Sequence, residues 1–246
     1  MNPNAAEFAR RIEHTCLAPE ATSERIDQLC DEAVEYGFHG VCVNPIHVRR
    51  AAERLARVCA GAGDGNAPIV ISVAGFPLGA CRTETKADEA RRAMDDGAFE
   101  IDMVALIGAI LDGDSSAVRR DIEAVAHAVH GAERPGLLKV ILETAVLSDE
   151  RIIMGCRACA EGEADFVKTS TGLHPAGGAR VEHVRLLRRH ASPIRVKAAG
   201  GIRDATAAMA MVDAGADRIG TSSGVAIIQS LKAIGGTTIN GGPDRS

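Results

Sequence analysis

Short runs of apolar residues alternate along the chain with longer segments in which apolar residues recur at helical spacing, with charged residues on the opposite face. The runs predict eight strands, at residues 12–15, 40–43, 69–75, 100–104, 137–143, 166–171, 194–200 and 218–222. A helix is predicted after each strand, at residues 23–36, 47–59, 83–96, 115–130, 149–161, 181–190, 205–214 and 224–234. This regular succession predicts an α/β fold, a (β/α)8 TIM barrel, with an open doubly wound sheet as the alternative.

Capping residues mark several of the predicted helix ends: Thr22 or Ser23, Ser148 and Asp204 at the starts, and Gly37, Gly97 and Gly215 just past the ends. No G-x-G-x-x-G motif follows the first strand, which favours the barrel over a dinucleotide-binding sheet. No linker or low-complexity block divides the chain. We therefore expect one domain over residues 1–246, with a flexible tail from about residue 235.

The amino-acid composition argues against several classes of protein. Apolar residues make up 46% of the 246 residues, but aromatic residues only 2%, so aliphatic side chains must fill the core. Few aromatic residues and a net charge of −5 argue against a single-stranded nucleic-acid binder, which needs stacking rings on a basic groove. No apolar stretch is long enough for a membrane span or a signal peptide, and seven scattered cysteines do not suit a secreted disulfide framework. We expect a cytoplasmic protein with reduced thiols.

Three ionisable residues interrupt the apolar strands: Asp102 in EIDMV, Lys168 in DFVKTSTG and Lys197 in RVKAAGG. Because side chains alternate along a strand, both lysines are predicted to face the barrel interior. A lone strand lysine more often lays its stem along apolar surface with its ammonium group in water. Two on consecutive strands would repel each other, and burial would be costly unless one lost its proton. A neutral lysine amine is a nucleophile that forms a Schiff base with a carbonyl substrate.

Lys168 is the better candidate for the nucleophile, because TSTG follows it and offers hydroxyls and amides to an oxygen-rich substrate. Lys197 would lower the pKa of Lys168 and pass protons. Asp102 is either a counterion of the two lysines or a proton shuttle acting through a water, and both roles could coexist. Lys139 and Glu143 share a strand face, and alternation alone does not decide whether they join this charge network.

Two glycine-containing turns, AAGGIRD at 198–204 and IGTSSG at 219–224, follow the last two strands, where barrels often bind phosphate. Either alone would be ordinary turn chemistry, whereas both together indicate a phosphate site. Cys156 and Cys159 share a helix face and are expected to be a buried apolar pair rather than a redox or metal site. The eight histidines show no metal-ligand spacing, so a metal-free site is expected.

The motifs of the chain together resemble those of the deoxyribose-phosphate aldolases, the DeoC family of class I aldolases. The resemblance runs from residue 12 to residue 224 and is carried by IEHTCL, VCVNP, GFPLG, GAFEIDMV, KVILETAVL, DFVKTSTG, KAAGGIR and GTSSG. It implies a carbon–carbon lyase that reversibly cleaves 2-deoxy-D-ribose 5-phosphate to D-glyceraldehyde 3-phosphate and acetaldehyde, in deoxyribonucleotide catabolism. It also implies a homo-oligomer, with a dimer favoured, and small-molecule substrates without a cofactor.

By the same resemblance, Lys168 forms the Schiff base, while Lys197 and Asp102 donate and accept protons. The residues implied to hold the substrate and its phosphate are Thr171, Gly172, Gly200, Gly201, Gly220, Ser222 and Ser223. Two alternatives are a related Schiff-base barrel acting on another phosphosugar and a non-catalytic phosphosugar sensor.

The chain departs from the family pattern at three places. Glu13 stands where Asp is more common, which affects one hydrogen bond near the substrate. Leu173 replaces a lysine that some members carry after KTSTG, so one cation is missing from the phosphate end. The C-terminal tail has no tyrosine to assist proton transfer, and Tyr36 is the only tyrosine in the chain.

Overall fold

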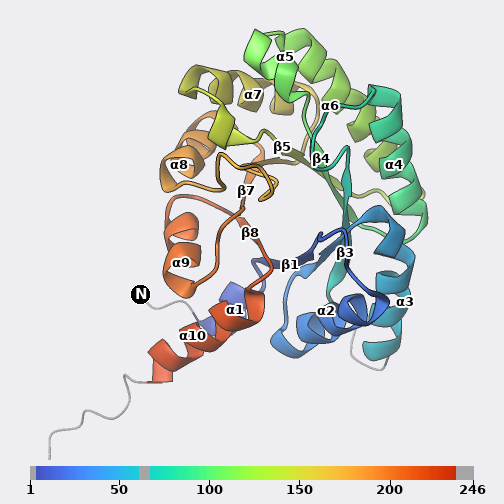
Figure 1. Cartoon of the computed structure of the whole chain (residues 1–246), viewed down its shortest axis with the longest axis vertical. Helices are drawn as coiled ribbons and strands as arrows, with labels where there is room; N and C mark the ends of the chain where they lie inside the picture. Colours follow the sequence, from blue (N-terminus) through green and yellow to red (C-terminus); the bar gives the residue numbers. More distant parts are fainter. Residues whose placement is uncertain (1–3, 61–66, 237–246) are drawn as a thin grey trace, which may run out of the picture.

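The computed structural model describes residues 4–60 and 67–236, and in it eight parallel strands close into a barrel (Figure 1). Each strand pairs with the next along the chain, and β8 pairs with β1. The strands are β1 (Ile12–Cys16), β2 (Gly40–Val43), β3 (Ile69–Ala74), β4 (Glu100–Val104), β5 (Leu137–Ile141), β6 (Phe166–Lys168), β7 (Arg195–Ala199) and β8 (Arg218–Thr221). The predicted (β/α)8 barrel is confirmed, and the open sheet is excluded by the pairing of β8 with β1.

Helices surround the barrel (Figure 1). The helices that follow the strands are α2 (Ser23–Tyr36), α3 (Val48–Val58), α4 (Thr83–Asp95), α6 (Ser115–His130), α7 (Asp149–Glu161), α8 (Val181–His190), α9 (Ala205–Asp213) and α10 (Gly224–Gly236). These helices match the prediction to within two residues at each end. The side chains of Thr22, Ser148 and Asp204 accept hydrogen bonds from the first turns of α2, α7 and α9, as expected of N-caps.

Four short elements were not predicted from the sequence. They are α1 (Ala5–Ala9), α5 (Ile107–Asp112) and the 3-10 turns η1 (Pro45–His47) and η2 (Thr144–Val146). Each is too short for a hydrophobic period to emerge over its length. Helix α1 contacts α10 and lies beside it near β1 (Figure 1). The tail predicted from about residue 235 falls largely beyond residue 236, outside the described residues.

Strands β5 and β6 end earlier than predicted, and both early ends shape the site. Strand β5 stops at Ile141, because Glu143 adopts a left-handed backbone with φ of 60° that a strand cannot contain. Strand β6 stops at Lys168, where the chain leaves the sheet and Thr169 donates its hydroxyl to the carbonyl oxygen of Ala199. Lys168 is therefore the last residue of its strand.

Aliphatic side chains of the strands and helices form the main core, which lies between the barrel and its surrounding helices. Inside the barrel, a small apolar group of three buried residues, Cys42, Ile71 and Val73, forms a separate cluster. Much of the remaining interior holds charged side chains, which are described below. Within 4–60 and 67–236, no helix combines the length and the hydropathy needed to cross a membrane.

Candidate active site

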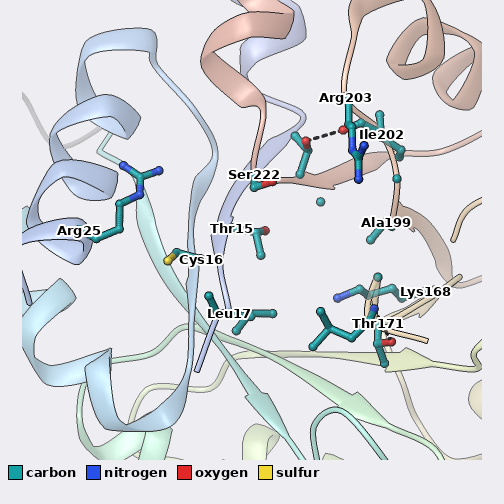
Figure 2. Close-up of a pocket in the computed structure, with 17 residues that line it drawn as sticks. Thr15, Cys16, Leu17, Arg25, Lys168, Thr171, Ala199, Ile202, Arg203 and Ser222 are labelled. Atoms are coloured by element: carbon teal, nitrogen blue, oxygen red, sulfur yellow. Dashed lines mark hydrogen bonds between the residues drawn. The ribbon is translucent and has the colours of Figure 1, made fainter. Parts of the chain in front are cut away.

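A cavity of about 340 Å³ opens at the carboxyl ends of β1, β6, β7 and β8 (Figure 2). This is the end of a (β/α)8 barrel at which active sites lie. The residues that line the cavity are Thr15, Cys16, Leu17, Ala18, Arg25, Lys168, Thr171, Gly172, Leu173, Ala199, Gly200, Gly201, Ile202, Arg203, Gly220, Thr221 and Ser222. In Figure 2 the side chain of Lys168 extends into this space, between Thr171 and Ala199.

The two strand lysines lie side by side inside the barrel. Lys168 and Lys197 are paired in the register of β6 and β7, which confirms that both face the interior. The side-chain nitrogen (Nζ) of Lys168 donates to Oδ2 of Asp102 at 2.7 Å, and Nζ of Lys197 approaches the same oxygen at 2.5 Å. Lys197 and Asp102 are wholly buried, whereas Lys168 is 3% exposed and lines the cavity. Lys168 is thus the member of this group that a substrate can reach.

The surroundings of the two lysines affect their pKa values in opposite directions. Burial lowers the pKa of Lys168, and the nearby charge of Lys197 lowers it further, against the opposing effect of Asp102. Burial also disfavours charge on Lys197, but Asp102 and Glu13 outweigh burial and raise its pKa. Burial would raise the pKa of Asp102, yet the three surrounding lysines hold it well below its ordinary value. The arrangement favours an ionised Asp102, a charged Lys197 and a readily deprotonated Lys168.

Lys139 joins this network and Glu143 does not, which settles the question that strand alternation left open. Nζ of Lys139 lies 3.0 Å from Oδ1 of Asp102 and 2.5 Å from Oε2 of Glu100. Glu143 is buried at the end of β5, where its Oε2 accepts from the backbone amide of Thr171 at 3.2 Å and from the Thr171 hydroxyl at 2.5 Å. Glu143 therefore holds the turn that follows Lys168 in place.

Glu13 lies inside the barrel and forms an ion pair with Lys197. It also lies within 4.8 Å of His39 and Glu100, measured between potential ligand atoms, a grouping that the dispersed histidines of the sequence did not suggest. Lys139 and Arg218 face the same carboxylates, at 3.5 Å and 4.0 Å from Oε1 of Glu13. Because these cations already face the carboxylates, we do not assign a metal site here.

Of the residues predicted to hold the substrate and its phosphate, all but Ser223 line the cavity. The backbone amide of Ser223 instead donates to the hydroxyl of Thr221. Gly200 and Gly201 have φ of 96° and 77°, and a Cβ on Gly200 would lie 2.9 Å from Cα of Gly178. These two positions require glycine, which leaves the backbone open to a ligand.

Two arginines also line the cavity, a feature that sequence motifs did not reveal. Arg203 follows β7, and Arg25 comes from α2 on the other side of the cavity (Figure 2). The Arg25 guanidinium lies 3.3 Å from Oε1 of Glu32. Leu173 lines the same cavity and is 57% exposed. The two guanidinium groups supply positive charge to the cavity, whereas Leu173 supplies none.

The remaining candidates from the sequence lie away from the cavity. Cys156 and Cys159 are buried on one face of α7, and burial raises the pKa of Cys156 to about 12, as expected of an unreactive apolar pair. The hydroxyl of Tyr36 accepts from Gln229 on α10 at 3.0 Å.

Lysine is scarce in this chain. Of its five lysines, Lys139, Lys168 and Lys197 lie inside the barrel. Lys86 on α4 is wholly buried and donates to Asp121 at 2.7 Å. Lys232 on α10 is exposed. Reagents that label amines therefore report on very few positions.

Comparison with known proteins supports an aldolase. The family model described as "DeoC/LacD family aldolase" matches residues 10–230. A deoxyribose-phosphate aldolase of Thermococcus gammatolerans is 52% identical over 92% of this chain and 97% of its own length, and one of Brevibacillus brevis is 49% identical over 91% and 96%. A solved structure of the tetrameric deoxyribose phosphate aldolase of Aeropyrum pernix superposes with a TM-score of 0.83 at 33% identity, covering 94% of this chain and 93% of that one. The chain belongs to the DeoC/LacD family of aldolases.

Proposed function

We propose that this chain reversibly cleaves 2-deoxy-D-ribose 5-phosphate to D-glyceraldehyde 3-phosphate and acetaldehyde through a Schiff base on Lys168. The observation that carries the proposal is the position of Lys168: its amine is at the base of the cavity, beside a charged Lys197 and an ionised Asp102. The relatives named deoxyribose-phosphate aldolase support the choice of substrate.

The first step is attack by the neutral amine of Lys168 on the aldehyde carbon of the open-chain sugar. A C–N bond forms, the carbonyl oxygen leaves as water, and the product is an imine. Loss of the proton of the C3 hydroxyl then drives cleavage of the C2–C3 bond. The bonding electrons pass into the protonated imine, which becomes an enamine, and glyceraldehyde 3-phosphate leaves.

The second half of the reaction returns the enzyme to its starting state. The enamine carbon takes up a proton, and water hydrolyses the resulting imine, which releases acetaldehyde and the free amine. Oδ2 of Asp102 contacts the side-chain nitrogens of both Lys168 and Lys197. Asp102 and Lys197, together with a water, are therefore placed to accept and return these protons.

The phosphate of the substrate would lie at the wall formed by Gly172, Gly200, Gly201, Gly220 and Ser222, with Thr171 nearer to the sugar. Ser223 would contribute from the start of α10, where the helix dipole favours an anion. The guanidinium groups of Arg25 and Arg203 add charge at the mouth.

Reductive trapping tests the proposal. Sodium cyanoborohydride with acetaldehyde should add one ethyl group to the peptide that contains Lys168. The Lys168→Leu variant should lose trapping and turnover while keeping the circular dichroism and melting temperature of a folded barrel, whereas Lys232→Leu should keep both activities. Full turnover by the Lys168→Leu variant would refute the assignment.

The alternative is that the substrate is another phosphosugar. A panel of phosphorylated sugars, assayed for release of glyceraldehyde 3-phosphate, distinguishes it from 2-deoxy-D-ribose 5-phosphate. A higher kcat/KM for a different phosphosugar would favour that alternative. A phosphosugar sensor would bind the panel but release no aldehyde.

We also propose that the protein is a cytoplasmic homodimer. All seven cysteines are free, which suits a reducing compartment. The Aeropyrum pernix relative is tetrameric, so light scattering with size-exclusion chromatography should decide between two and four copies.

A further inference from the structure

A continuous chain of charged side chains runs through the barrel from its amino-terminal end to the cavity. It begins at His39, just before β2, whose Nε2 lies 3.1 Å from Oε1 of Glu100, the first residue of β4. The other oxygen of Glu100 contacts Lys139 at 2.5 Å, and Lys139 contacts Asp102 at 3.0 Å. Asp102 then holds Lys168 at 2.7 Å. Each contact along this path is short enough to be an ion pair or a hydrogen bond.

Inside the barrel, the positive and negative side chains are equal in number when Lys168 is left out. Three carboxylates are present, those of Glu13, Glu100 and Asp102, all at most 3% exposed. The cations that face them from the other strands are Lys139 on β5, Lys197 on β7 and Arg218 on β8, in addition to Lys168 on β6. Three cations match three carboxylates, so Lys168 is the fourth cation and the one whose proton is least needed.

The number of carboxylates near each lysine affects how readily that lysine loses its proton, and Glu100 is one of the carboxylates near Lys139. Lys139 has three carboxylates within 3.5 Å, and their combined charge raises its pKa against the effect of burial. In the described part of the chain Lys168 has one carboxylate partner, Asp102, which it shares with Lys197 and Lys139. Glu100 is the carboxylate closest to Lys139, and it does not line the cavity.

We propose that Glu100 is a positioning residue for the reaction: its buried charge, held against Lys139 beneath Asp102, sets the pH at which the amine of Lys168 becomes free to form the imine. This inference rests on the proposed Schiff-base function of Lys168. Glu100 itself is held by His39, which is partly exposed at the other end of the barrel, and the Arg218 guanidinium lies 3.4 Å from the same imidazole nitrogen.

The sign of the effect follows from the charges. Replacing Glu100 with glutamine removes one negative charge but leaves Asp102 and Glu13 within 3.5 Å of Lys139, so Lys139 stays protonated. The interior then carries one more positive charge than before, which disfavours the proton on Lys168. Imine formation should therefore extend to lower pH in the Glu100→Gln variant.

The other titratable groups near this path are His39, Arg195 and the thiol of Cys42. Arg195 stacks on the ring of Phe166 at 4.1 Å, and burial raises the pKa of Cys42 to about 11. The Cys42 thiol therefore stays neutral below about pH 9, and the substitution alters neither Cys42 nor Arg195.

The experiment measures the initial rate of trapping by acetaldehyde and sodium cyanoborohydride between pH 5 and 9, for the full-length chain. The midpoint for Glu100→Gln should lie about one pH unit below that of the wild type, the size expected of a buried charge roughly 8–10 Å away at an effective dielectric constant of about 20. The midpoint for Glu100→Asp, which keeps the charge, should lie close to that of the wild type. Asp165→Asn is the matched control, because Asp165 also pairs with a histidine, at 2.9 Å, but does not contact the interior lysines. Its midpoint should stay at that of the wild type.

Three outcomes are distinguishable. A midpoint for Glu100→Gln that coincides with the wild type, in a variant with unchanged circular dichroism, would overturn the inference. An equal shift in Glu100→Asp would also overturn it, because the effect would then follow packing rather than charge. If the wild type itself forms no adduct on Lys168, the proposed Schiff-base function fails instead.

Discussion

Replacing Lys197 with methionine tests how strongly the charge of Lys197 lowers the pKa of Lys168. The two nitrogens contact the same oxygen of Asp102, at 2.5 and 2.7 Å, so they lie no more than about 5 Å apart. At an effective dielectric constant of about 20, two unit charges at this distance repel by about 3 kcal/mol, which corresponds to about two units of pKa. Methionine keeps most of the volume and removes the charge. The pKa of Lys168 should therefore rise by about two units in Lys197→Met.

The change should appear in imine formation before it appears in turnover, because Lys197 also serves in proton transfer. At a pH below both midpoints, the neutral fraction of Lys168 falls about tenfold for each unit of pKa, so trapping should slow about 100-fold. The pH at half-maximal trapping should move upward, opposite to the shift expected for Glu100→Gln. Lys232→Met, on the exposed surface, serves as the matched control and should leave the profile unchanged.

A midpoint for Lys197→Met within about half a pH unit of the wild type would refute this reasoning, provided that the variant is folded. The repulsion between the two lysines would then be screened far more than their burial suggests. A downward shift would mean that Lys197 normally favours the proton on Lys168, and the charge balance given above would be wrong.

Three further predictions concern other parts of the fold. Gly200→Ala should lower stability by about 1–3 kcal/mol and raise KM, because its Cβ would lie 2.9 and 3.1 Å from the Cα atoms of Gly178 and Gly172; thermal melting and steady-state kinetics test this. Arg203→Gln should raise KM for the phosphorylated sugar about tenfold with little change in kcat, and should leave activity on unphosphorylated deoxyribose unchanged. Lys86→Met should cost about 3–5 kcal/mol in unfolding free energy, because the buried Asp121 loses its cation and keeps the hydrogen bond from the Thr83 hydroxyl; denaturant unfolding measures this.

Each of these predictions has its own control. Gly177→Ala, where nothing lies within 4 Å of the added carbon, separates strain from steric contact. An equal loss of activity on both sugars by Arg203→Gln would place Arg203 outside phosphate binding. For Lys86, the double variant Lys86→Met with Asp121→Leu should be more stable than the single one, and a single variant as stable as the wild type would contradict the argument.

The strands, most helices and their caps follow from the sequence because local chemistry determines them. Apolar runs and helical spacing identify the elements, and residues such as Thr22 and Asp204 cap helix starts by accepting hydrogen bonds from backbone amides three residues later. The same is true of Lys168 and Lys197, since alternation along a strand decides which face a side chain takes. These features depend on residues close together in the chain.

The parts that sequence reasoning left open depend on residues far apart in the chain. Lys139 and Glu143 have the same parity on β5, but the backbone of Glu143 turns out of the strand, so one side chain enters the charge network and the other binds Thr171. The contact of Glu100 with His39 joins positions 61 residues apart. Arg25 reaches the cavity only because α2 packs beside β1. No periodicity along the chain encodes such contacts.

The distribution of lysine has a consequence for a protein that would release and take up aldehydes. The chain carries 23 arginines and only five lysines, so its surface cations are almost entirely guanidinium groups. Guanidinium does not lose its proton at accessible pH, and it does not condense with simple aldehydes as a neutral amine does. Acetaldehyde that leaves the cavity therefore meets, among the lysines, only the exposed amine of Lys232. Few lysine amines on the surface are therefore available to condense with the product aldehyde, whereas the amine of Lys168 faces the cavity in which that aldehyde would form.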